Sequence, residues 1–139
     1  MDDSRARLRE ISRRLVPLHR LLLERERHAY EARHGAIPSG SALRLALHDG
    51  RFAWLRTLSS VMVKIDEAVD ADDPVTERDV HAVRRELYRL LKSGEADTFQ
   101  EKYRIALQES PDVVMAHAAV SALLRTESGP PVAAGGPAS

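Results

Sequence analysis

A regular pattern of apolar positions runs through residues 51–71, RFAWLRTLSSVMVKIDEAVDA. Apolar side chains recur there at alternating steps of four and three, a spacing that places them on one face of an α-helix. A second apolar row runs beside the first and widens the stripe to about 140° of the helix surface. We therefore predict that this segment, which holds the only tryptophan, is the central helix of a bundle. Its core anchors are Trp54, Leu58 and Ile65.

The first 34 residues carry another apolar stripe, at heptad-like spacing. The pattern predicts a helix that begins near Asp3 or Ser4, both good N-caps, and that ends at His34 before Gly35. Pro17 lies inside this segment and has no N–H to donate, so we expect a kink or a break there. We expect this helix to pack antiparallel to the central one. Its stripe consists of Leu8, Ile11, Leu15, Leu18, Leu22 and Ala29.

Capping signals predict three more helices after the central one. The segment TERD, from Thr76, is a near capping box that opens a helix ending near Lys92. The segment TFQE, from Thr98, is a better capping box and opens the next helix. Ser110 and Pro111 have the N-cap and N1 signature of a last helix.

Two other segments have a different character. Residues 35–41, GAIPSGS, predict a turn before a short helix over 42–48. Residues 128–139, SGPPVAAGGPAS, carry no charge and predict a disordered tail. No strand pattern and no internal repeat is present. The sequence therefore predicts an all-α bundle of five to six helices, formed as one domain by residues 1–127.

The composition narrows the function without naming one. Lys and Arg number 21, and so do Asp and Glu, so no overall field favours nucleic acid or an anionic membrane. The absence of cysteine excludes disulfides, thiolate metal sites and cysteine nucleophiles. The first residues lack the apolar run of a secretory signal, and no stretch approaches the roughly 18 apolar residues of a membrane span. We therefore expect a cytoplasmic protein.

Arginines gather at two places in the sequence. The first 34 residues hold nine basic and six acidic residues, and Arg84, Arg85 and Arg89 form a small patch further on. Nucleic-acid binding favours such patches when aromatic residues interleave them or when a recognition helix presents them. Neither arrangement is evident, so we interpret both groups as solvated faces and do not favour a nucleic-acid partner.

Five polar residues lie on or beside the apolar stripes of their helices. If they met in space, they would form a buried cluster of imidazoles and carboxylates with shifted pKa values. Such a cluster is a candidate ligand site. The alternative is that each is a core residue whose hydrogen bonds are made by its own neighbours. The five candidates are His19, Glu26, Tyr30, Asp66 and His117.

The six histidines do not follow the patterns of helical metal proteins. A di-iron bundle needs two Glu-x-x-His motifs, and this chain has one, from Glu31 to His34. His28 and His34 are six residues apart and point to opposite sides of a helix. Phosphate-binding loops, nucleophile elbows and His-Glu-x-x-His motifs do not occur in the sequence. We therefore predict no metal ion, no cofactor and no catalytic residues.

Two stretches of the chain resemble known sequences. Residues 48–59, HDGRFAWLRTLS, followed by Ile65-Asp-Glu, are similar to a segment of small, uncharacterised bacterial all-helical proteins, a family defined by a domain of unknown function. Residues 111–117, PDVVMAH, are similar to the same proteins. Together the stretches cover under a fifth of the chain. The resemblance implies a bacterial cytosolic protein with an all-α domain, and it carries no activity and no site residues.

These patterns favour a non-enzymatic module for protein interaction or regulation. The long heptad-like first helix and the small residues of the last helix suit a protein partner or a second copy in a homodimer. The alternative function is a small-ligand-binding or metal-binding bundle that uses the five polar residues. We do not expect association with a membrane.

Overall fold

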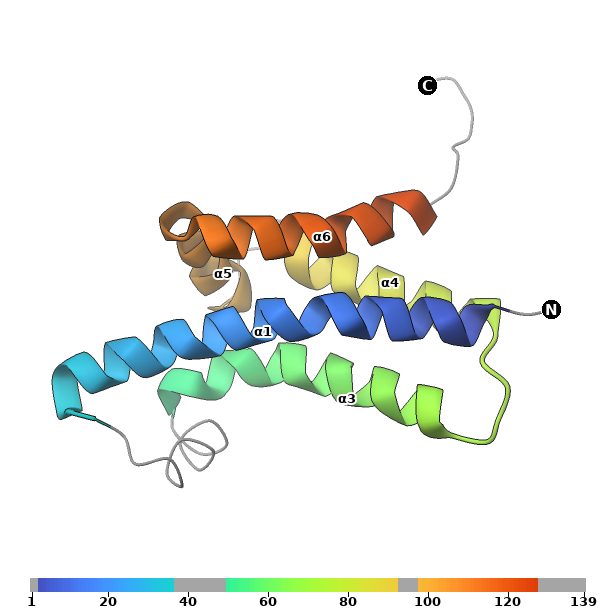
Figure 1. Cartoon of the computed structure of the whole chain (residues 1–139), viewed down its shortest axis with the longest axis horizontal. Helices are drawn as coiled ribbons and strands as arrows, with labels where there is room; N and C mark the ends of the chain where they lie inside the picture. Colours follow the sequence, from blue (N-terminus) through green and yellow to red (C-terminus); the bar gives the residue numbers. More distant parts are fainter. Residues whose placement is uncertain (1–2, 37–49, 93–97, 128–139) are drawn as a thin grey trace, which may run out of the picture.

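The computed structural model describes residues 3–36, 50–92 and 98–127, and these form a bundle of helices without strands (Figure 1). The predicted all-α fold is confirmed. The short helix expected over 42–48 and the tail expected over 128–139 lie outside the described residues. The described elements are α1 (Ser4–His34), the 3-10 helix η1 (Gly50–Leu55), α3 (Arg56–Asp70), α4 (Glu77–Lys92), α5 (Thr98–Glu109) and α6 (Pro111–Glu127).

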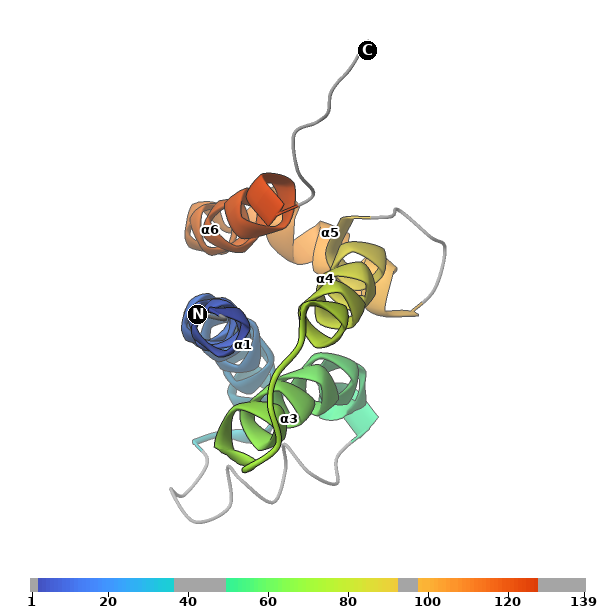
Figure 2. The same cartoon turned by 90° about the vertical axis from the view of Figure 1, so that its right-hand side faces the viewer.

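The long helix α1 is the element to which the others attach. It packs against α3 on one side and α6 on another, and α4 also contacts it (Figures 1 and 2). Its predicted bounds are confirmed: Asp3 is the N-cap, and the N–H of Gly35 donates to the carbonyl of Glu31 at 2.8 Å. Gly35 has φ 86°, the left-handed conformation that glycine adopts without strain. The helix continues through Pro17 without the break that the sequence left open.

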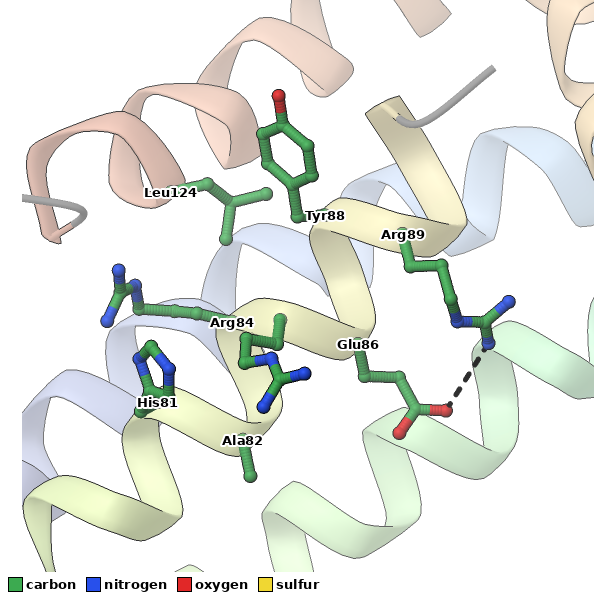
Figure 3. A pocket seen from close by; sticks show the side chains of 8 residues that line it. His81, Ala82, Arg84, Glu86, Tyr88, Arg89 and Leu124 are labelled. Carbon is green, nitrogen blue, oxygen red and sulfur yellow. Dashed lines mark ion pairs between the residues drawn. The ribbon is translucent and has the colours of Figure 1, made fainter. Parts of the chain in front are cut away.

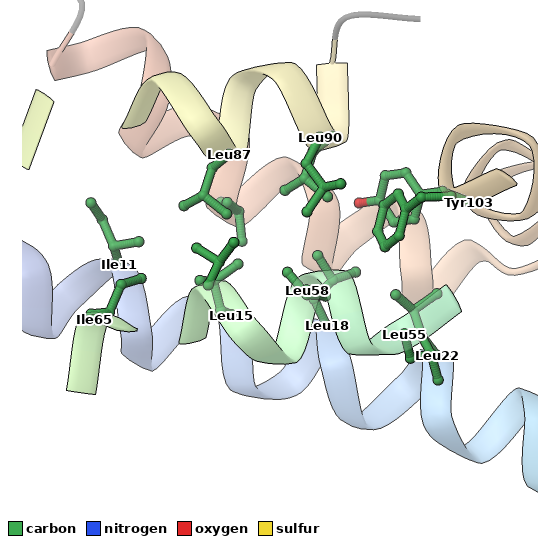
Figure 4. Close-up of a cluster of buried hydrophobic side chains, with 14 of the residues drawn as sticks. Ile11, Leu15, Leu18, Leu22, Leu55, Leu58, Ile65, Leu87, Leu90 and Tyr103 are labelled. Carbon is green, nitrogen blue, oxygen red and sulfur yellow. The ribbon is translucent and has the colours of Figure 1, made fainter. Parts of the chain in front are cut away.

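The core lies where α1 faces the other helices (Figure 4). Five apolar residues of the predicted α1 stripe have no exposed surface, and Leu58 and Ile65 of α3 have none either. Trp54 is 7% exposed. The sixth member of the predicted stripe, Ala29, is exposed and does not belong to the core. The five fully buried α1 residues are Leu8, Ile11, Leu15, Leu18 and Leu22.

The central helix differs from its prediction in the first turns. Residues 50–55 form a 3-10 helix, and α3 begins only at Arg56. In a continuous α-helix, Phe52 would point about 120° away from Leu58, toward solvent. The tighter 3-10 winding, about 120° per residue, aligns Phe52 with Leu55, and both side chains are buried. The apolar side chain of Phe52 therefore explains the altered winding.

The capping predictions at Thr76 and Ser110 are confirmed, whereas Thr98, predicted to cap the helix after it, is the first helical residue of α5. The N–H of Thr76 donates to Asp79 Oδ2 at 3.0 Å, and the N–H of Asp79 donates to Thr76 Oγ1 at 3.2 Å, which is the reciprocal pair of a capping box. The Ser110 hydroxyl accepts from the N–H of Val113 at 3.2 Å and caps α6. None of the described helices combines the length and the apolar character that crossing a bilayer requires.

Candidate functional sites

The contact between α1 and α3 contains a row of polar residues at heptad intervals along α1. The first is Arg5, whose guanidinium donates to carbonyls at the end of α3 and just beyond it. The last carbonyls of a helix have no intrahelical donors and form the negative end of its dipole, so a cation is favourable there. The interaction also fixes the antiparallel order of α1 and α3. The acceptors are the carbonyls of Ala68 (3.3 Å), Val69, Ala71 (3.2 Å) and Asp73 (2.7 Å).

Three more contacts follow at steps of seven residues along α1, and their partners on α3 and η1 run in the opposite direction along the chain. Residues seven apart on a helix lie on the same side, so a single neighbouring helix meets all of them. We call these contacts, together with that of Arg5, the α1–α3 polar seam. They join Ser12 Oγ to Asp66 Oδ1 at 3.0 Å, His19 Nε2 to Ser59 Oγ at 2.7 Å, and Trp54 Nε1 to Glu26 Oε2 at 2.9 Å.

The hydrogen bonds at His19 determine its tautomer. Ser59 donates its hydroxyl proton to the carbonyl of Leu55 at 3.1 Å, so its oxygen is left to accept from His19. The imidazole therefore carries a proton on Nε2. Burial lowers the pKa of His19, because the charged imidazolium is poorly solvated between the two helices. The bond at Nε2 and the lowered pKa describe a neutral histidine that holds a partner on α3.

His117 belongs to a different part of the molecule. Its Nδ1 shares a 2.6 Å hydrogen bond with the hydroxyl of Tyr103, which is 1% exposed. Burial raises the pKa of the Tyr103 phenol, so the phenol stays neutral at physiological pH. Burial first, and then the positive charge of Lys92, lower the pKa of His117. The pair links α5 to α6.

The structure does not gather the five predicted site residues into one cluster. Glu26, His19 and Asp66 each hold a separate partner in the polar seam, and the seam contacts are about 10 Å apart along α1. The ring of Tyr30 lies 4.3 Å from that of His34 and 6.4 Å from that of Phe52, measured between centroids. Within residues 3–36, 50–92 and 98–127, no three His, Cys, Asp or Glu side chains are placed to hold a metal ion.

Sequence reasoning missed a group of cations where α4 approaches α6. Lys92 donates to the hydroxyl of Ser121, which is 4% exposed, and Arg125 donates to the same oxygen at 3.3 Å. Two positive charges thus converge on one buried neutral atom. The Lys92 ammonium also lies 5.9 Å from the centre of the Tyr88 ring. The only trace of this group in the sequence is the nearby basic patch of the 77–92 helix, for which the sequence predicts a solvated face.

A pocket of about 650 Å³ opens on the outer side of α4, beside Tyr88 (Figure 3). Arg84, Arg85 and Arg89 line it, together with His81, Glu86 and Leu124 of α6. In Figure 3, the side chains of Glu86 and Arg89 point toward α3. The Glu86 carboxylate lies 3.9 Å from a guanidinium nitrogen of Arg89 and 4.0 Å from the ammonium nitrogen of Lys64. Glu86, the one carboxylate among the described residues of the pocket lining, therefore forms its ion pairs on the α3 side. We call Lys92 and Arg125, which converge on the Ser121 hydroxyl, the α4–α6 cation cluster.

The outer face of α6 is a second unusual surface. Met115 is 72% exposed, Val114 is 44% exposed, and Ala118 is exposed between them and the end of the helix. At 100° per residue, Met115, Ala118 and Ala122 fall within about 60° of one another. The opposite face of α6 supplies Val113, Val120 and Leu124 to the core, so the helix is apolar on both sides.

Comparisons of this chain with protein-family models, with curated proteins and with solved structures found no match. The resemblance to small bacterial helical proteins therefore stays a prediction.

Proposed function

We propose that this chain is a non-enzymatic interaction module that pairs with a second copy of itself through the outer face of α6. The observation that carries the proposal is the apolar character of α6 on both sides. A helix of this kind is typically buried, because an amphipathic surface helix presents charged residues to water. The face of Val114, Met115 and Ala118 is therefore suited to a protein partner.

The order of residues along α6 favours a second copy in antiparallel orientation. Asp112 and Arg125, both exposed, lie near opposite ends of the helix. Antiparallel pairing brings the acidic end of each helix to the basic end of the other, and it also opposes the two helix dipoles. Around the midpoint, Met115 of one copy faces Ala122 of the other, and the small side chain of Ala118 allows a close approach. The formal net charge of zero removes electrostatic repulsion between copies.

The alternative from the sequence is a ligand or metal site built on the five polar residues. It has less support, because the structure places each of the five against a different partner. Bacterial origin and a cytoplasmic location belong to the proposal as well. The lack of cysteine supports the location, since an intracellular protein does not rely on disulfides.

Native mass spectrometry and sedimentation equilibrium test the proposal. We expect the wild-type protein to be a dimer at micromolar concentration, and Met115→Glu to make it a monomer with unchanged helix content. The matched control is Ile105→Glu, which places the same charge on an exposed apolar site of α5 (48% exposed) and leaves the dimer intact. A monomeric wild-type protein contradicts the proposal, and so does a dimer that survives Met115→Glu.

The antiparallel orientation has its own test. Asp112→Arg creates like charges at both ends of the pair and weakens the dimer, whereas Asp112→Arg combined with Arg125→Asp restores it. If the double variant is as weak as the single one, the copies pair in another orientation.

A further inference from the structure

Met115 is the most exposed of the large apolar side chains in the described part of the chain, at 72%. Oxidants that reach the thioether sulfur of a methionine convert it to a sulfoxide. The sequence contains no cysteine, so no thiol of this chain competes with its three methionines for an oxidant. Met62 of α3 is half-buried and packs against the core. Of the two methionines that the structure describes, Met115 is therefore the one whose sulfur is open to an oxidant in solution.

Oxidation changes the chemistry of the Met115 side chain but leaves its length and its place on α6 unchanged. With hydrogen peroxide, the sulfur forms a bond to one oxygen, the O–O bond breaks, and the second oxygen leaves as water with both protons. The sulfur loses two electrons and the peroxide gains them. The product has a polar sulfoxide where the side chain had an apolar thioether.

The outer face of α6 offers a sulfoxide at position 115 no side-chain hydrogen-bond donor. Val114 and Ala118 are apolar, and the carboxylate of Asp112 is an acceptor, as is the sulfoxide oxygen. In the antiparallel pair, Met115 of one copy faces Ala122 of the other, which also lacks a side-chain donor. Pairing of oxidised copies therefore removes two sulfoxide oxygens from water without giving them a partner, which is unfavourable.

We propose that oxidation of Met115 by a peroxide dissociates the pair, and that a thiol-dependent methionine sulfoxide reductase restores it. This inference rests on the pairing proposed above and adds its regulation. The peroxide reacts with the free copy, in which Met115 is exposed, and the sulfoxide then disfavours pairing of that copy. In the reverse step two thiols of the reducing system become a disulfide, and the sulfoxide oxygen leaves as water.

Peroxide treatment of the full chain tests the inference. Peptide mass mapping measures sulfoxide formation at each methionine, at a protein concentration below the dissociation constant of the pair. Sedimentation equilibrium measures that constant before and after treatment. We expect Met115 to be oxidised faster than Met62, and the dissociation constant to rise by about tenfold or more. Methionine sulfoxide reductase with dithiothreitol then returns the constant to the value of the untreated protein.

Two variants assign the effect to one sulfur. Met62→Leu retains the sulfur of Met115, so peroxide weakens its pairing as it does in the wild-type protein. Met115→Leu has no sulfur at this position, so treatment leaves the variant's own dissociation constant within about twofold of its untreated value. Circular dichroism before and after treatment shows that each protein stays folded.

The outcomes separate this inference from the pairing on which it rests. If the untreated protein is a dimer and stays one with Met115 oxidised, the inference is overturned and the pairing stands. Faster oxidation of Met62, or dissociation of treated Met115→Leu, overturns the inference in the same way. A monomeric untreated protein overturns the pairing, and this inference with it.

Discussion

The α1–α3 polar seam and the α4–α6 cation cluster are both polar regions between helices, but their described hydrogen bonds are arranged differently. In the seam each polar group of α1 meets a partner of matching chemistry on or next to α3, as Glu26 meets the indole N–H of Trp54. In the cation cluster, Lys92 and Arg125 converge on the hydroxyl of Ser121. The comparison shows that polar residues on an apolar face do not by themselves mark a binding site.

The largest expected effect tests the seam. We expect Trp54→Ala to lower the free energy of unfolding by about 3 to 5 kcal/mol, because it leaves a cavity and removes the hydrogen-bond partner of Glu26. Trp54→Phe keeps most of the apolar contact and loses the hydrogen bond, so its cost is about 1 to 2 kcal/mol. Urea unfolding followed by circular dichroism measures both values. A loss below about 1 kcal/mol in Trp54→Ala contradicts a structural role for the seam.

The next effect concerns the side of the molecule that carries the cation cluster. Tyr103→Phe removes the hydroxyl bonded to His117, and we expect it to lower the free energy of unfolding by about 1 to 2 kcal/mol. Tyr88→Phe removes the same atom from an exposed ring and serves as the control, with a change within about 0.5 kcal/mol. Equal effects of the two substitutions would show that the buried hydrogen bond between Tyr103 and His117 contributes little to the free energy of unfolding.

The sequence predicts the fold where the signal is local. The stripe of α1, its stop at Gly35 and the reciprocal cap of Thr76 and Asp79 are all set by residues within a few positions of one another. The winding of η1 is not local in this sense. It depends on the burial of the Phe52 side chain in the core. The spacing of apolar residues in the following helix does not predict that burial.

The candidate site residues were less predictable, because the residues on one face of a helix do not show which other helix packs against that face. His19 and Glu26 are seven residues apart and share a side of α1, but the antiparallel partner separates them by giving each its own contact. The repeat of polar residues at 5, 12, 19 and 26 is the signal that identifies a seam. The convergence of Lys92 and Arg125 joins two helices distant in sequence, so it becomes visible only in three dimensions.

The smallest expected effect is the dependence of stability on pH and salt, which differs between the two regions. The pKa values of His19 and His117 are both lowered from 6.5 in the folded protein, so the unfolded chain binds more protons as the pH falls below 6.5. Stability is therefore full above pH 6.5 and decreases as the pH falls, and His19→Gln or His117→Gln each removes part of this decrease.

Salt then separates the two histidines. Burial alone lowers the pKa of His19, whereas the charge of Lys92 contributes at His117 and is screened by ions. Urea unfolding at pH 7 and pH 5, in low and high potassium chloride, measures the difference. We expect salt to reduce the acid-induced loss in His19→Gln, which retains His117, more than in His117→Gln, which retains His19. If salt acts equally on both variants, the charge of Lys92 does not lower the pKa of His117, and the electrostatic difference between the two histidines is contradicted.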